Sequence, residues 1–236
     1  MDFFDLANKR RSIRKFTDEE VPEEVIEKSL KTALLAANSS NLQPWEFYWI
    51  KDKNKKEELI KACFSQNAAK TAKELVVAVS RIDTWKRNRD LVISHYKSKD
   101  KLLPLVEKYY NTLVPLQYYY DPFGISTIIR KIILFFFNFI GFFKPIARGP
   151  SNKHELFEIV TKTTALACQN IMMSLVAQGY DSCPMEGFDN SRVKKLLNLN
   201  NKSHDVMVLG IGKRDPKGVY GDRYRIDEDL VIKIVD

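Results

Sequence analysis

Cysteine and histidine are scarce in this 236-residue chain, and their scarcity excludes several kinds of site. The three cysteines, Cys63, Cys168 and Cys183, are scattered and odd in number, so they cannot complete a disulfide framework, and their spacing matches no zinc motif. The three histidines show neither triad nor metal-ligand spacing. The sequence therefore predicts no metal site and no side-chain nucleophile.

A signal peptide and a dinucleotide-binding motif are also absent from the sequence. The start of the chain, residues 1–5, lacks the basic residues and the long apolar run of a signal peptide. Cysteines without a disulfide pattern are typical of a reducing compartment, so we expect a cytoplasmic protein. No Gly-x-Gly-x-x-Gly turn between a strand and a helix is present, which argues against a dinucleotide-binding fingerprint.

Long apolar runs are nearly absent as well. The exception is Ile132–Phe143, which is interrupted by Asn138 and Gly141 and is too short to cross a bilayer, because a crossing helix needs about 20 residues. Three interpretations stay open. The segment is a helix buried in the chain or at a dimer interface, which we favour, or a lid over a site, or a helix lying on a membrane. Membrane association is the least expected of the three.

Positive charge exceeds negative charge, with a formal net charge of +8 and a pI near 9.2. Such an excess suits nucleic acid, an anionic membrane surface or anionic small molecules. However, the basic residues mostly alternate with acidic ones, as in residues 51–61, which is typical of a solvated surface. No motif of a nucleic-acid-binding module is present. We therefore expect no nucleic-acid partner.

The length of the chain fits one domain over residues 1–236, with a substantial core. Apolar residues at helical spacing predict helices over 21–37, 54–64 and 154–178. Gly179 is placed to end the last of them. Short apolar stretches predict strands over 46–50, 75–79, 206–212 and 230–235. Strands separated by helices indicate an α+β or α/β sheet covered by helices, with a variable, aromatic-rich insertion at about 85–150.

Two segments of the chain suit a phosphate group. Arg10, Ser12 and Arg14 share a face if their segment is extended, and guanidinium groups beside a hydroxyl match phosphate oxygens. Arg223 and Arg225 repeat this spacing near the end of the chain. Taken alone, each segment is equally consistent with solvated surface charge.

Two further segments suit a heteroaromatic ring. The polar loop over residues 38–45 offers amides, hydroxyls and backbone N–H groups that can bind the edge of a ring. In residues 183–188, Gly187 beside Glu186 lets the backbone approach a flat ligand. Taken alone, the loop over residues 38–45 is equally consistent with a turn held by Trp45. Residues 183–188 are equally consistent with an ordinary connection after the long helix.

In this set and order, the four segments resemble the nitroreductase family over nearly the whole chain except about 85–150. The Asn-Leu-Gln-Pro-Trp and Pro-Met-Glu-Gly-Phe elements carry the resemblance. It implies an α+β fold with a mixed central sheet flanked by helices, in an intertwined homodimer with FMN at the interface. The implied cofactor-binding residues are Arg10, Arg11, Ser12, Arg14, Asn38, Ser39, Ser40, Asn41, Gln66, Asn67, Pro184, Met185, Glu186, Gly187, Arg223 and Arg225.

The resemblance also implies a role for each segment. Residues 10–14 would hold the FMN phosphate and pyrimidine edge, and residues 38–41 would reach the cofactor from the other subunit. Residues 184–187 would line the ring, with the Glu186–Gly187 backbone near the flavin nitrogen N5. Arg223 and Arg225 would complete the phosphate clamp. Ala37 and Asn38 depart from the proline and serine that the family commonly has there.

The activity implied by the resemblance is transfer of a hydride from NADH or NADPH through FMN to nitroaromatic or quinone-like acceptors, by a ping-pong mechanism. The flavin carries the chemistry, so no catalytic side chain is implied. Other flavin reactions on the same fold, such as dehalogenation, flavin breakdown or dehydrogenation, stay open alternatives. So does a flavin-binding protein without turnover. The family varies its substrates through the region equivalent to 85–150, so the physiological acceptor is not determined.

Overall fold

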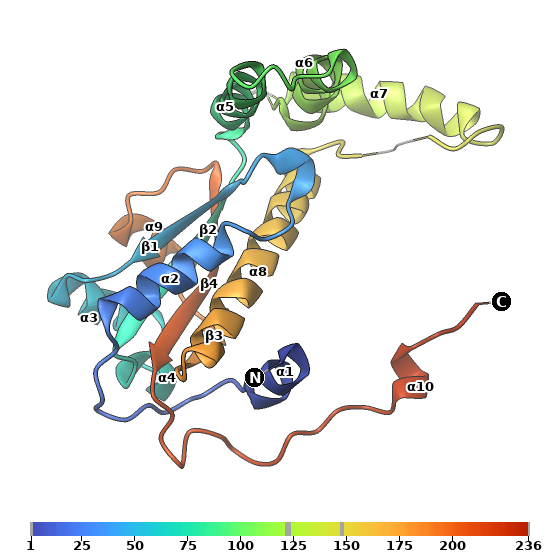
Figure 1. Cartoon of the computed structure of the whole chain (residues 1–236). Helices are drawn as coiled ribbons and strands as arrows, with labels where there is room; N and C mark the ends of the chain where they lie inside the picture. Colours follow the sequence, from blue (N-terminus) through green and yellow to red (C-terminus); the bar gives the residue numbers. More distant parts are fainter. Residues whose placement is uncertain (1, 121–123, 147–148, 236) are drawn as a thin grey trace.

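The computed structural model describes residues 2–120, 124–146 and 149–235 (Figure 1). Its elements follow one another in the order α1 (Phe3–Lys9), α2 (Glu23–Ala33), η1 (Ser39–Asn41), β1 (Trp45–Trp49), α3 (Lys53–Ala62), α4 (Asn67–Lys70), β2 (Glu74–Arg81), α5 (Trp85–Lys97), α6 (Pro104–Tyr118), α7 (Ile125–Ile140), α8 (Lys153–Ala177), β3 (Asp181–Met185), α9 (Asn190–Leu196), β4 (Ser203–Gly212) and α10 (Glu228–Val231). The expected α+β organisation is confirmed, because helices pack against a sheet rather than alternating with parallel strands.

The centre of the fold is a four-stranded sheet in the order β1-β2-β4-β3, and each neighbouring pair of strands is antiparallel. The expected sheet is mixed. Within the described residues, parallel pairing is confined to the isolated bridge between Ser12 and Ser182. β2 and β4 are central and are buried on both faces, which explains why their sequences are almost unbroken apolar runs. β1 forms one edge of the sheet, and no strand in the described ranges pairs with its outer side.

Helices cover both faces of the sheet, because successive side chains of a strand point to opposite sides. Val76 and Ala78 of β2 pack in one core with buried residues of α2 and α8. Leu75, Val77 and Val79 pack in a second core with α3, α4 and α9. The chain thus buries its apolar residues in two layers, one on each side of the same sheet.

The longest helix, α8, has sequence-determined ends. Asn152 caps its start, because the Asn152 side-chain oxygen accepts hydrogen bonds from the backbone N–H groups of His154 (2.9 Å) and Glu155 (3.0 Å). After the helix ends at Ala177, Gly179 adopts a φ of +81°, a left-handed conformation that glycine adopts without strain. The expected helix over 154–178 and its end at Gly179 are confirmed. The helix has 25 residues and is roughly 37 Å long.

The other sequence-based predictions for this part of the fold also match. The expected helix over 21–37 is shorter, because α2 begins after Pro22 and ends at Ala33. The expected helix over 54–64 corresponds to α3. The strands expected over 46–50, 75–79 and 206–212 correspond to β1, β2 and β4.

Two predictions about strands need correction. The strand expected over 230–235 is wrong, because residues Glu228–Val231 form the short helix α10, whose first turn carries the helix-favouring acids Glu228 and Asp229. Beyond it, Ile232 is extended but pairs with no strand in the described part of the chain. Conversely, residues 181–185 form β3, although they contain Pro184. Proline is tolerated there because β3 lies at the edge of the sheet.

The aromatic-rich region folds into α5, α6 and α7. A third core joins α5 and α6 to Leu156 and Val160 near the start of α8. The segment 132–143 lies mostly in α7, which extends away from the body of the molecule (Figure 1). Burial of this segment within its own chain is wrong, because Phe135 is 73% and Phe139 69% exposed. Its burial at a dimer interface stays a prediction. Among the described helices, none is long and apolar enough to cross a membrane.

Candidate functional site

The basic segment near the start of the chain lies along β3. Besides the bridge between Ser12 and Ser182, the backbone N–H of Ile13 donates to the carbonyl of Ser182 (3.0 Å). Ile13 is completely buried, so the alternation of side chains places Ser12 and Arg14 on the opposite side of this extended segment. The predicted common face of these two residues is therefore present.

The segment 184–187 begins in the same strand. Pro184 and Met185 pair with β4, whereas Glu186 and Gly187 are exposed immediately beyond the end of β3. A Cβ atom placed on Gly187 would have no neighbour within 4 Å, so the space above this backbone is open. The amide nitrogen Nε2 of Gln66 donates to the carbonyl of Gly187 (3.2 Å). The structure thus joins the predicted Gln66 to the predicted ring-lining segment, while Asn67 is an exposed residue of α4.

The position of Gln66 depends on close packing of α4 against β4. A Cβ atom on Gly210 would lie 2.7 Å from the carbonyl oxygen of Ala68 and 3.3 Å from the Cβ of Ala72. Only glycine allows the helix backbone to approach the strand this closely. Gln66 immediately precedes α4, so this approach sets the reach of its amide toward Gly187.

The segment that contains Arg223 folds back over the basic N-terminal segment. Arg223 donates to the carbonyls of Asn8 (2.6 Å), Arg10 (2.5 Å) and Ala7 (3.3 Å) at the C-terminal end of α1. These carbonyls carry the negative end of the helix dipole, which favours a cation. Arg11 donates to the carbonyl of Gly221 (2.8 Å). The two basic segments, more than 200 residues apart in sequence, therefore form one cluster.

The arginine cluster has no carboxylate partner among the residues that the structure describes. In the described ranges, no salt bridge reaches its members, Arg10, Arg11, Arg14, Arg223 and Arg225. Burial, followed by the charges of Arg225, Arg11 and Arg10, lowers the pKa of Arg223. Neighbouring cations are paired instead: Lys15 contacts Asp215 (3.0 Å) and Arg214 contacts Asp181 (2.5 Å). The cluster is thus suited to bind an anion.

The polar loop 38–41 lies elsewhere. Ser40 and Asn41 adopt φ values of 55° and 49°, and two tyrosines of α6 hold the loop in place. The Ser40 hydroxyl is 2.6 Å from that of Tyr109, and the Tyr110 hydroxyl donates to the Ser40 carbonyl (3.0 Å). The loop is next to Leu42, which packs with Leu156 and Val160 near the start of α8.

The arginine cluster and the polar loop therefore occupy opposite ends of α8, because β3 follows the far end of that helix (Figure 1). A single chain brings Gln66 and three of the predicted segments to the same end of α8: residues 10–14, 184–187 and 223–225. It does not bring the predicted residues Asn38, Ser39, Ser40 and Asn41 to them. The roughly 37 Å length of α8 separates the two groups.

Sequence reasoning overlooked three tyrosines. The guanidinium carbon of Arg14 lies 4.9 Å from the ring centroid of Tyr220, which orients this otherwise exposed side chain. Tyr220 is close to Arg223 in sequence, so an aromatic residue beside the basic pair was an available signal. Tyr109 and Tyr110 hold the loop at residue 40, and no local pattern in the sequence indicates that long-range contact.

The three cysteines are buried and free. Burial raises the pKa of the Cys63 thiol to about 11 and that of Cys168 to about 12. Burial also raises the pKa of Cys183, while the charge of Arg14 acts in the opposite direction. Thiols in such surroundings are protonated at neutral pH and are poor nucleophiles. The cysteines therefore supply no reactive thiolate to this region.

A groove of about 820 Å³ opens beside β1, the edge strand. It is lined by residues of α2 and α5 and by Asn41 and Gln43 of the polar loop. Apolar side chains line much of it, including Leu30, Trp45 and Phe47. The free edge of β1 and this groove together form an apolar surface that a further segment of polypeptide could cover.

The fold and this arrangement define an α+β protein with a cluster of arginines at one end. A family model described as "Nitroreductase family" matches residues 7–213, and the chain belongs to that family. A candidate NAD(P)H nitroreductase of Staphylococcus epidermidis, SERP2086, is 27% identical over 216 residues, covering 88% of this chain and 84% of the relative. Iodotyrosine deiodinase 1 of Pongo abelii is 40% identical over 60 residues, 25% of this chain and 21% of that protein.

Solved structures share the fold over the whole chain. A candidate NAD(P)H:FMN oxidoreductase of Staphylococcus epidermidis superimposes with a TM-score of 0.76 and 18% identity, covering 99% of this chain and 96% of the other. A candidate nitroreductase of Exiguobacterium sibiricum in complex with FMN gives a TM-score of 0.71 and 22% identity, covering 99% and 98%. The predicted fold and family are thus confirmed.

Proposed function

We propose that the chain is an NAD(P)H-dependent FMN oxidoreductase that reduces nitroaromatic or quinone-like acceptors by a ping-pong mechanism. The observation that carries this proposal is the arginine cluster along β3, the strand that leads to the open backbone at Gly187. The relatives described as NAD(P)H nitroreductases and the FMN complex of a structural neighbour support it. The buried, free cysteines support a cytoplasmic location.

The residues present fit FMN. Arg10, Arg11, Ser12 and Arg14, together with Arg223 and Arg225, would hold the phosphate through charge-assisted hydrogen bonds. Pro184, Met185, Glu186 and Gly187 would lie against the ring, and Gln66 would orient the Gly187 carbonyl that it already contacts. FMN, when bound, supplies hydride transfer between the donor and the acceptor. The open space at Gly187 is compatible with the approach of a flat ligand to this backbone.

The protein's own contribution is binding and electrostatics. The cluster of arginines stabilises anionic groups, which include the phosphates of NADH or NADPH. The absence of a carboxylate paired with these arginines in the described ranges leaves their full charge available to such ligands. No acid, base or nucleophile is required of a side chain, in agreement with the raised thiol pKa values.

We also propose that a homodimer completes the site. The arginine cluster and the loop 38–41 lie at opposite ends of α8 (Figure 1). An antiparallel arrangement of two α8 helices would place the loop of the second copy beside the cluster of the first. The apolar residues 230–235 are exposed and would add to the free edge of β1 in the second copy, beside the 820 Å³ groove.

The test is the spectrum of the purified protein followed by anaerobic titration with NADPH and then with a quinone or nitroarene. We expect flavin absorbance that bleaches with NADPH and returns with the acceptor, and chromatography should identify the released flavin as FMN. FAD, or no bound flavin after FMN is supplied, would contradict the cofactor proposal. Bound FMN without NADH or NADPH oxidation would favour a flavin-binding protein without turnover.

One alternative reaction has a specific observation in its favour. The 60-residue match to a deiodinase supports reductive dehalogenation on the same flavin site. An assay with an iodinated phenol under the same reducing conditions separates the two reactions. Release of iodide at a rate above that of quinone reduction would favour dehalogenation over the main proposal.

A further inference from the structure

The helix α7 presents an apolar face to solvent instead of to the protein. Residues at helical spacing share this face, and each is at least half exposed: Ile125, Ile128, Ile129, Ile132, Phe135, Phe136 and Phe139. The turn that follows adds Phe142 and Phe143, at 84% and 80% exposure. A surface helix ordinarily turns such a face toward the core. This arrangement requires another surface to cover it.

The orientation of α7 is fixed by its opposite side. Leu134 and Phe137 line a groove of about 320 Å³ against α6, together with Leu113 and Leu116. From the same side, the Arg130 guanidinium donates to the carbonyls of Leu116 (2.6 Å) and Tyr119 (2.5 Å) at the end of α6. These bonds hold Arg130 inward, so the apolar face is held outward.

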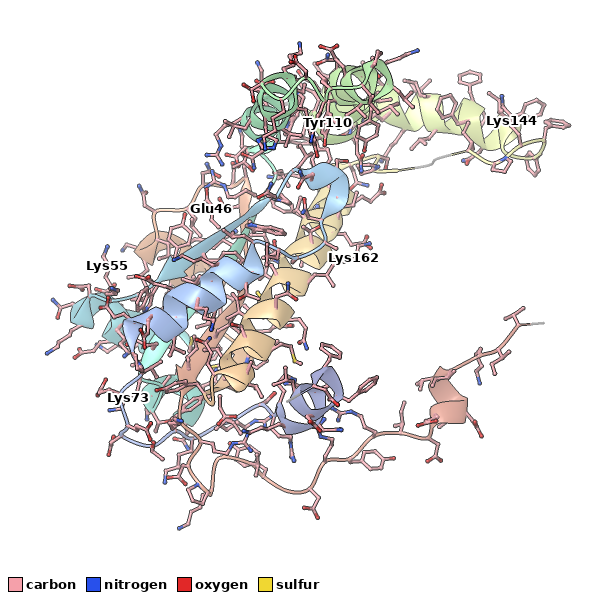
Figure 2. The ribbon with its side chains drawn as sticks, viewed as in Figure 1. Glu46, Lys55, Lys73, Tyr110, Lys144 and Lys162 are labelled. Atoms are coloured by element: carbon pink, nitrogen blue, oxygen red, sulfur yellow. The ribbon has the colours of Figure 1, made fainter. Side chains whose placement is uncertain are left out.

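The charged residues of α7 and its following turn are all basic. The sequence from 122 to 154 contains no acidic residue, whereas Arg130, Lys131 and Lys144 belong to the helix or its following turn. Figure 2 places Lys144 at the end of the projecting helix, far from the sheet. Lys131 is exposed, and its charge acts on Glu155 near the start of α8. An apolar face flanked by cations is complementary to an anionic lipid surface.

We infer that α7 and its following turn, residues 125–144, bind the surface of an anionic lipid bilayer. The helix would lie in the plane of the interface, with its Ile and Phe side chains among the acyl chains and its lysines at the headgroups. Its 16 residues, about 24 Å long, suit this orientation and not a crossing. The inference is independent of the cofactor proposal, because no residue of the arginine cluster contributes to this surface.

Charge favours lipid over a second copy of α7 as the occupant. In a symmetric pair, the same patch faces itself, so Lys131 and Lys144 of each copy would approach the cations of the other. Such juxtaposition of like charges is costly. An anionic bilayer instead attracts each cation near its surface.

Flotation of the FMN-loaded full chain with vesicles tests this inference. We expect binding to vesicles of phosphatidylcholine with about 30% phosphatidylglycerol, and much weaker binding to phosphatidylcholine alone. Replacing Phe135 and Phe139 with serine should lower the affinity roughly 100-fold or more. Lys144→Gln should lower it about 5-fold, and Lys131→Gln no more than that because Glu155 already offsets its charge.

Two controls keep the result interpretable. Leu35→Ser removes an apolar side chain that is 81% exposed outside α7, and its vesicle affinity should equal that of the unchanged protein. Retained flavin absorbance shows that each variant is folded. Hydrogen exchange of the unchanged protein should show vesicle-dependent protection within residues 125–143.

Three outcomes would overturn the inference. The first is absence of vesicle binding by the unchanged, FMN-loaded protein. The second is equal vesicle affinity of the Phe135/Phe139 variant. The third is protection of 125–143 that rises with protein concentration in the absence of vesicles, together with a smaller oligomer for that variant, because a second copy would then be the occupant.

Discussion

The helices α7 and α8 are both rich in apolar residues, yet only α8 finds its partner within the chain. Ile171 and Leu175 of α8 are at most 1% exposed, because the sheet and α2 cover them, and Leu156 is equally buried against α5 and α6. Phe135 and Phe139 of α7 stay largely exposed. Apolar periodicity thus reveals that a face will be covered, but it does not reveal by what. The body of the molecule is completed by its own chain, whereas α7, the arginine cluster and the C-terminal segment are left open.

The largest expected effect concerns the C-terminal segment. Truncation after Tyr224 should yield a monomer or an aggregate without bound flavin, because it removes Arg225 and the exposed apolar residues Leu230, Ile234 and Val235 proposed to cover a second copy. Light scattering with flavin absorbance measures both properties. A folded, flavin-bound monomer would show that flavin binding requires neither this segment nor the dimer.

The contrast between the two helices can be tested directly by truncating one side chain in each. Leu175→Ala should lower the free energy of unfolding by about 2–5 kcal/mol, because it opens a cavity in a fully buried core. Phe136→Ala should change it by less than about 0.5 kcal/mol, because that ring is 61% exposed. Urea unfolding at a fixed protein concentration gives both values. Comparable losses of unfolding free energy in the two variants would mean that protein covers α7, and the two helices would then not differ in this respect.

The open arginine cluster should behave differently from paired surface cations. Arg14→Ala and Arg225→Ala should each weaken FMN binding by about 10- to 150-fold, because a charge-assisted contact with phosphate contributes roughly 1.5–3 kcal/mol. Lys51→Ala should leave the dissociation constant unchanged, since Lys51 contacts Glu23 (2.7 Å) at a different part of the surface. Flavin fluorescence titration measures all three variants. Unchanged affinity in both arginine variants would remove these side chains from the phosphate site.

The smallest expected effect is on the free energy of unfolding, through Glu155 near the start of α8. Hydrogen bonds to Glu155, first from the Ser151 N–H (2.6 Å), lower the pKa of its carboxyl group below the ordinary value, against the effect of burial. The ionised carboxylate therefore stabilises the fold above the ordinary pKa, and this contribution is lost as pH falls through the lowered value. Glu155→Gln should cost about 1 kcal/mol at pH 7 and little in strong acid. A cost independent of pH would exclude the carboxylate as its source.

The sequence predicted those parts of the fold whose determinants are local. The long helix, its end at Gly179 and the buried strands β2 and β4 follow from hydrophobic runs and a glycine that adopts positive φ. β3 was overlooked because Pro184 argues against a strand unless the strand lies at an edge, and edge position is a property of the whole sheet. The strand expected over 230–235 was wrong because a strand needs a neighbour, which the described chain does not supply.

The site was predictable as a set of segments but not as an arrangement. Arg10, Ser12 and Arg14 were proposed from their spacing, and Arg223 from its spacing to Arg225. That Arg223 would bind the carbonyls at the end of α1 depends on how the last part of the chain returns to the first. The separation of Ser40 from this cluster depends on the direction of α8, which no local pattern encodes.

The close approach at Gly210 has a consequence for how this sequence can change over time. Any single substitution there places a side-chain atom 2.7 Å from the Ala68 carbonyl oxygen, so α4 would have to move before the substitution could be accommodated. Movement of α4 would carry Gln66 away from Gly187. The order of mutations is thereby constrained: a substitution at position 210 is accommodated only after other changes have moved the backbone of α4, because the Ala68 carbonyl oxygen is a backbone atom that a new side chain at position 68 would not remove. A buried glycine on one strand thus restricts the evolutionary routes open to a contact on the surface of the site.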